Sequence, residues 1–233
     1  MPIRKVPLTT GEYYHVFNRT IGKRYIFLEK KFNNYFLQLI DYYKTDSPSI
    51  RFSLYKRLAK GDQQHIRSQL KSKKQRVKVL SYCLMPTHFH FLLEQLTDGG
   101  ISSFIGTVLN VFVQYYNKRN ATNGPLFLPR FKAVHIDNDM LIKHVSRYIH
   151  LNPFSSGIVS NRIHLENYPW SSYGEYLGRG YSTICDTNLI LNMFRNDRYA
   201  YKRFIDERSA YQKTLEKLKH INKTEINNTT GRY

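Results

Sequence analysis

Cysteine is scarce in this chain of 233 residues, and its scarcity limits the sites that the chain can build. Cys83 and Cys185 are the only two, and they do not form a paired spacing such as Cys-x-x-Cys. This pattern argues against a disulfide scaffold and against a cysteine-based metal cluster. A reducing compartment is therefore the expected environment.

Long apolar runs are also missing. No stretch reaches the roughly 18 apolar residues of a membrane span, and Met1 to Thr10 contains no hydrophobic signal region. We therefore expect a cytoplasmic protein without a membrane partner.

Acidic residues are few. The chain has 17 Asp and Glu against 36 Lys and Arg, which gives a formal net charge of +19. A surface this basic attracts polyanions, most often nucleic acid. Aromatic residues make up 15% of the chain, and aromatic rings among cations suit stacking on unpaired bases. Most of the 19 tyrosines are nevertheless expected to be core or rim residues.

Hydrophobic periodicity predicts alternating strands and helices. Strands are predicted over 13–19, 77–85, 87–95 and 131–136, and helices over 32–43, 101–116 and 139–151. The order β-α-β-β-α-β is the ferredoxin-like split βαβ pattern, an α+β fold with an antiparallel sheet, and one further helix follows it. Asp137 is expected to cap that helix and Pro153 to end it.

Residues 47–75 interrupt this pattern. From Lys44 to Lys78 there are eleven Lys and Arg and two Asp. The stretch is compatible with a helical insertion that has a basic face or with a partly ordered loop, and its charge with either a solvated face or a nucleic-acid contact. We assign 1–153 to the main domain, 154–220 to a helical extension packed on it, with a helix over 197–218, and 221–233 to a loose polar tail.

His88-Phe89-His90 is the sharpest local feature. On a strand, residues i and i+2 point to the same face, so His88 and His90 project together while Phe89 projects to the other layer. Two neutral imidazoles side by side form half of a metal site. The alternative interpretation is two histidines that hydrogen-bond locally on a polar face.

Tyr148 and Asn152 are spaced four residues apart on the last predicted helix, so they share one helix face. Val145 and Leu141 continue the same stripe. Taken alone, this spacing is also typical of a core tyrosine followed by an asparagine at a helix end. The sequence pattern by itself leaves both interpretations open.

Several segments together resemble the HUH single-strand endonucleases, specifically the single-tyrosine, IS200-like transposases associated with repetitive extragenic palindromes (REP). The segments occur in the family's order between about residues 13 and 177. They are Tyr14–Arg19, the Met85–His90 strand, Gly124–Ala133, Ser146–Pro153 and Tyr168–Tyr173.

The resemblance implies an enzyme that cuts and rejoins single-stranded DNA next to palindromic hairpins through a 5′-phosphotyrosine intermediate. It implies that His88, His90 and Asn152 bind a divalent metal and that Tyr148 is the nucleophile on a catalytic helix. Nitrogen and oxygen ligands without thiolate suit Mg²⁺ or Mn²⁺. Relatives of this kind work as monomers or homodimers, and the sequence leaves that choice open.

Further expectations concern individual side chains. Basic residues that flank the predicted strands are candidate phosphate contacts: Arg19, Lys23, Arg24, Arg130 and Lys132. Thr87 stands where the family often has Asn, and we expect little consequence. His135, His144 and His150 are expected to be structural, and Trp170 and Tyr173 to pack the extension onto the core.

Two rival functions stay open. A basic, aromatic-rich protein could hold DNA or RNA hairpins without cutting them. A replication initiator or relaxase would share the chemistry, but such relatives often use two tyrosines or another motif order. One tyrosine located after both histidines disfavours that reading.

Overall fold

Four strands form one antiparallel sheet in the order β2-β3-β1-β4. The computed structural model describes residues 7–179 and 184–207, and the strands are β1 (Tyr13–Arg19), β2 (Val77–Met85), β3 (His88–Gln95) and β4 (Lys132–Ile136). β3 lies between β1 and β2, and β1 lies between β3 and β4, so each crossover connection skips one strand. This is the split βαβ arrangement, and the predicted α+β class and antiparallel sheet are confirmed.

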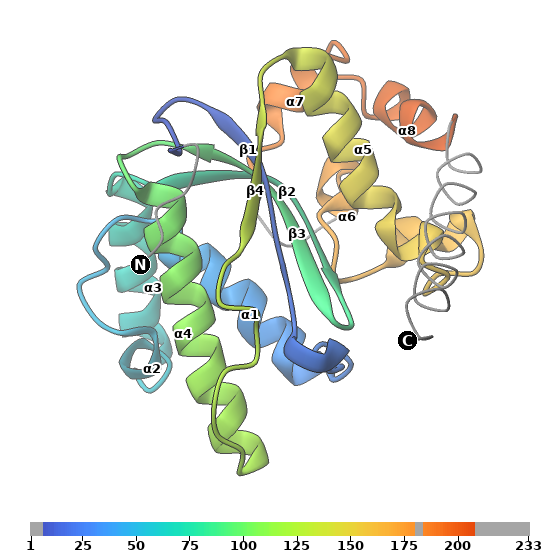
Figure 1. The fold of residues 1–233 in the computed structure, drawn as a ribbon. Coiled ribbons are helices and arrows are strands. Elements are labelled where there is room, and N and C mark those ends of the chain that lie inside the picture. Colours follow the sequence, from blue (N-terminus) through green and yellow to red (C-terminus); the bar gives the residue numbers. More distant parts are fainter. Residues whose placement is uncertain (1–6, 180–183, 208–233) are drawn as a thin grey trace, which may run out of the picture.

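Helices α1 (Lys30–Tyr43) and α4 (Gly100–Asn120) cover one face of the sheet (Figure 1). The start of α4 is set by close packing. A Cβ atom on Gly100 would stand 2.3 Å from the carbonyl oxygen of Arg76, so only glycine fits there. The preceding Gly99 adopts a left-handed conformation with φ of 62°, and the chain turns at this point from β3 into the helix.

An aromatic core fills the space between these helices and the sheet. Phe89 and Phe91 of β3 are fully buried, and the Phe36 ring of α1 lies 5.5 Å from Phe89. Phe36 meets Phe112 of α4 edge-on at 5.0 Å. Burying a ring of this size stabilises a fold by about 2–3 kcal/mol. The sheet therefore has a rigid backing on this side.

The opposite face is covered by α5 (Asp139–Ser155) and by the short elements that follow it (Figure 1). These are η2 (Arg162–Asn167), α6 (Tyr173–Tyr176), α7 (Asn188–Asn192) and α8 (Arg198–Asp206). The same segment covers the outer edge of β2, where the Leu84 amide donates to the Trp170 carbonyl at 2.8 Å and the Ser172 amide to the Tyr82 carbonyl at 3.0 Å. The η1 turn (Ile21–Lys23) follows β1. None of the helices in the described ranges is long and apolar enough to cross a membrane.

The ends of α5 differ from the sequence prediction. Asn138, not Asp137, is the N-cap, and its side chain accepts from the Leu141 amide at 2.9 Å. Pro153 does not end the helix, which continues to Ser155. Pro153 cannot donate to the Ile149 carbonyl four residues earlier, but helical bonding resumes after it, where the Ser156 amide donates to the Asn152 carbonyl at 3.0 Å.

Residues 47–75 contain two helices, α2 (Phe52–Tyr55) and α3 (Lys60–Ser72), so the helical alternative is confirmed. The insertion closes on itself, since the Asp46 amide donates to the Lys74 carbonyl at 2.8 Å. Phe52 is buried and anchors its tip against α1. At the far end of the chain, Asp197 caps α8. The predicted continuation of this helix to residue 218 and the predicted tail fall beyond the described residues.

Candidate metal and nucleophile site

The register of β1 and β3 determines what surrounds the histidine pair. His90 lies directly opposite Phe17, and His88 directly opposite Arg19. Directly paired residues share a sheet face, so both histidines lie on the α5 side, away from the phenylalanine core. Their ring centroids are 5.1 Å apart, as the strand alternation predicted.

His15 of β1 joins this pair and was missed by sequence reasoning. Its Nε2 lies 3.0 Å from Nδ1 of His90, and the two rings stack with centroids 5.2 Å apart. Alternation along 13–19 does place His15 on one face with Phe17 and Arg19. Only the register with β3, however, shows that this is the face of His90.

Hydrogen bonds at Nδ1 orient both candidate ligands. The hydroxyl of Thr87 lies 3.0 Å from Nδ1 of His88, while His15 occupies Nδ1 of His90. A metal-bound histidine normally gives its other ring N–H to an acceptor, which fixes the ring and its tautomer. His88 and His90 would therefore bind a metal through Nε2. Thr87, the residue that stands where the family often has asparagine, supplies the contact to His88.

Burial keeps these rings uncharged. His90 is 6% exposed. Burial, followed by the neighbouring His15 and His88, lowers the pKa of His90 well below its ordinary value. Burial also lowers the pKa of His15 to about 4. Both rings are neutral near pH 7, which is the form that can bind a cation through a lone pair.

Tyr148 of α5 faces the same cluster. Its ring lies edge-on to His90 at 5.6 Å and to His15 at 5.7 Å. Asn152 follows one turn later; it is buried, and its side-chain amide donates to the Tyr148 carbonyl at 3.1 Å. That bond occupies the amide nitrogen and leaves the amide oxygen as the atom that could bind a metal.

The donor set suits a hard divalent cation. Within 7–179 and 184–207 no group of three or more His, Cys, Asp and Glu gathers to hold a metal. The candidate ligands that could hold a metal here are the two imidazoles of His88 and His90, with the Asn152 amide oxygen as a candidate third. Such a set leaves positions for oxygen atoms from outside the protein.

A buried polar network links α5 to α8 and to the segment at the β2 edge. His150 is fully buried, with Nδ1 2.7 Å from the Tyr201 hydroxyl and Nε2 2.7 Å from the Ser172 hydroxyl. Burial lowers its pKa to about 3, so the ring is neutral. These bonds tie α8 and the β2-edge segment to the helix that carries Tyr148. The predicted structural role of His150 is confirmed, and Tyr173 is buried beside it as expected.

The other two histidines that were expected to be structural, His135 and His144, also contact neighbouring side chains. The His135 ring lies 2.7 Å from a carboxylate oxygen of Glu12 on the surface, and His144 lies 2.6 Å from the Arg147 guanidinium. Both contacts are within the protein, as expected of structural residues. Trp170 is partly buried against the core, which confirms its packing role.

The five predicted phosphate contacts gather at one end of the sheet and are exposed. Arg19 lies opposite His88, and Lys132 lies opposite Phe17, in the same row as His90. The loop that carries Lys23 and Arg24 is bonded to the turn before His88, since the Thr20 amide donates to the Thr87 carbonyl at 2.9 Å. Arg130 follows a segment whose Leu128 amide donates to the Arg19 carbonyl at 3.0 Å.

Fold and site together define a class: a split βαβ sheet on which a His-x-His strand faces a tyrosine carried by the helix after the last strand. Residues 50–152 match the family model of the IS200-like transposases. This part of the chain is therefore similar to the IS200-like transposases.

A solved structure of a REP-associated tyrosine transposase bound to a REP hairpin is similar in fold, with a TM-score of 0.50. It shares 17% sequence identity with this chain, and the match covers 80% of this chain and 93% of that one. The comparison with curated protein sequences found no match.

Proposed function

We propose that this chain is a metal-dependent endonuclease and strand transferase for single-stranded DNA. The observation that carries the proposal is the approach of the Tyr148 ring to the neutral pair of His15 and His90. A tyrosine on its own is a poor nucleophile, because its ordinary pKa is about 10. Its position beside His90, one of the proposed metal ligands, is what would activate it.

In the proposed reaction the Tyr148 oxygen attacks the scissile phosphorus and its phenolic proton is lost. The bond from phosphorus to the 3′-oxygen breaks, and that oxygen leaves as a 3′-hydroxyl after gaining a proton. The product is a 5′-phosphotyrosine. The number of phosphodiester bonds is unchanged, so a 3′-hydroxyl can attack in the reverse direction and rejoin a strand without ATP.

His88, His90 and Asn152 would hold Mg²⁺ or Mn²⁺. When bound, the ion supplies Lewis acidity to a phosphate oxygen. Arg19 and Lys132, which stand in the sheet rows of the two histidines, would hold flanking phosphates. A stacked, paired backbone does not readily enter such a site, so the cut strand is expected to be unpaired.

The site for cutting is proposed to lie next to palindromic hairpins, in keeping with the hairpin named for the similar structure. A hairpin-binding protein that no longer cuts is the alternative, and the basic surface favours it equally. That alternative gives no reason for the chain to contain His88, His90, Tyr148 and Asn152, or for the Tyr148 ring to lie beside His90. A replication initiator or relaxase is disfavoured by the single tyrosine on α5.

An adduct assay tests the proposal. The protein is mixed with Mn²⁺ or Mg²⁺ and labelled single-stranded DNA that contains the hairpins flanking its own gene, and the products are resolved on a denaturing gel. We expect a shifted band that EDTA prevents and that Tyr148→Phe abolishes. Tyr199→Phe is the matched control, because Tyr199 is 65% exposed on α8 and should leave the band unchanged. Intact hairpin binding without any adduct would favour the non-cutting alternative.

A further inference from the structure

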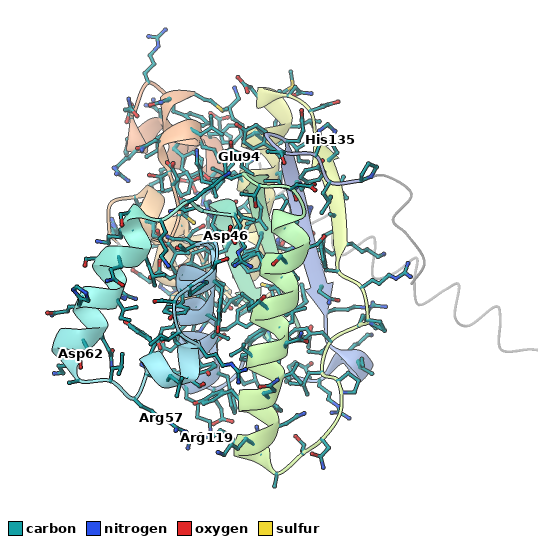
Figure 2. The ribbon with its side chains drawn as sticks, turned by 90° about the vertical axis from the view of Figure 1, so that its left-hand side faces the viewer. Asp46, Arg57, Asp62, Glu94, Arg119 and His135 are labelled. Carbon is teal, nitrogen blue, oxygen red and sulfur yellow. The ribbon has the colours of Figure 1, made fainter. Side chains whose placement is uncertain are left out.

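A second basic site lies on the other face of the sheet from the histidines. It is a cleft of about 1130 Å³ between α4 and the tip of the insertion, with α1 at its base. Arg57 from the insertion and Arg119 from α4 stand on its two walls, and Figure 2 labels both at the lower end of the molecule. No part of the proposed cutting reaction uses this cleft.

The charge of the cleft is of one sign. Its cations are Arg51, Lys56, Arg57, Lys118 and Arg119. Each is exposed, and none forms an ion pair with another described residue. The sequence contains no Asp or Glu over 47–61 or over 99–136, the two stretches that form the walls. A cleft with uncompensated cations on both walls attracts a polyanion.

The aromatic residues in the cleft indicate which part of a nucleic acid it would contact. Tyr35 and Tyr115 stack on each other with centroids 3.6 Å apart and planes 9° apart. The Arg119 guanidinium lies 5.6 Å from the Tyr115 ring, and Phe52 meets Tyr35 edge-on at 5.4 Å. Ring surface that a base would need is therefore already covered. Proteins that hold single strands depend on open stacking platforms, and this cleft offers cations instead.

We infer that the cleft binds the phosphate backbone of double-stranded DNA. A duplex carries one negative charge for about every 1.7 Å of its axis, and cations on two facing walls suit that density. Identifying the duplex as the stem of a hairpin rests on the proposed function, whereas the affinity for duplex phosphates does not. The insertion would thus hold a stem on one face of the sheet while the histidine face acts on an unpaired strand.

Fluorescence anisotropy with a blunt stem-loop that lacks single-stranded flanks tests this inference. Arg57→Glu combined with Arg119→Glu should weaken binding at least tenfold, and the salt dependence should fall by about two units of slope, at about 0.9 per phosphate contact. Lys74→Glu combined with Arg195→Glu is the control, because it changes the net charge equally at exposed positions outside the cleft. Arg57→Gln with Arg119→Gln serves if the reversed pair fails to fold by circular dichroism.

Equal weakening by the cleft pair and the control pair would overturn the inference, since the effect would then be one of total charge. Loss of affinity for an unstructured single strand as large as that for the stem would also overturn it. Binding of the stem needs no cleavage, so the result stands even if Tyr148 proves inactive. If the proposed function holds, the cleft pair should still form the adduct on a short unstructured strand.

Discussion

The two faces of the sheet are built from the same strands but do different work. On β3, Phe89 and Phe91 enter a closed aromatic core, while His88 and His90 face α5. One face is filled by rings that pack, and the other carries the rings that we propose bind a cation and the tyrosine that we propose attacks the phosphate. Because side chains alternate along a strand, the packing of Phe89 and Phe91 on one face of β3 fixes the backbone that carries His88 and His90 on the other.

The sharpest test of this comparison uses two consecutive residues. Phe89→Ala should lower the free energy of unfolding by about 3–5 kcal/mol, because it removes a fully buried ring. His88→Ala, one residue earlier on the other face, should lower it by about 1 kcal/mol or less, yet it should abolish the metal-dependent adduct. Urea denaturation followed by circular dichroism measures both. Similar unfolding energies for the two variants would contradict the division of the faces.

A smaller effect is expected at His15, the positioning residue behind His90. His15→Phe keeps a ring of similar shape but removes the acceptor for Nδ1 of His90, and Mn²⁺ affinity should fall about 10- to 100-fold. Titration calorimetry measures the affinity, with the melting temperature as a check on the fold. His15→Gln, which retains an acceptor, should recover part of the loss. Unchanged affinity in the phenylalanine variant would limit His15 to packing.

The smallest effect concerns one phosphate contact on the histidine face. Arg19→Ala should weaken binding of single-stranded DNA a few-fold and reduce the salt dependence by about 0.7 units of slope. Lys31→Ala is the control, because Lys31 is already paired with Glu29 at 2.7 Å and lies at the start of α1. Fluorescence anisotropy over a series of salt concentrations gives the slope of the DNA affinity against salt for each variant. Equal slopes would remove Arg19 from the DNA contacts.

Much of this arrangement was predictable from periodicity. Alternation in β3 separates His88 and His90 from Phe89, and i, i+4 spacing brings Tyr148 and Asn152 together, so both halves of the site follow from local geometry. Their meeting does not, because it depends on how α5 crosses the sheet. From the sequence alone, only the resemblance to a known family links them.

Three features could not be predicted from local periodicity or propensity: the role of His15, the helix beyond Pro153 and the basic cleft. His15 joins the site because the register of β1 and β3 brings its ring to that of His90, which is 75 positions later in the sequence. The helix continues for two residues past Pro153, and its last turn ends where the amide and hydroxyl of Ser156 donate to the Asn152 carbonyl. The cleft needs the insertion to fold against α4. Each of these features is set by tertiary contacts rather than by neighbours in the sequence.

The backbone bonds between β2 and the Trp170–Ser172 segment have a consequence for self-association. An open sheet edge is a template on which another chain can add a strand. Here the β2 edge is already occupied, and the other edge is formed by β4, a strand of five residues that begins with Lys132. Short, charged edge strands discourage strand addition. Two copies of this chain that associate are therefore expected to meet through helices or loops rather than by extending the sheet.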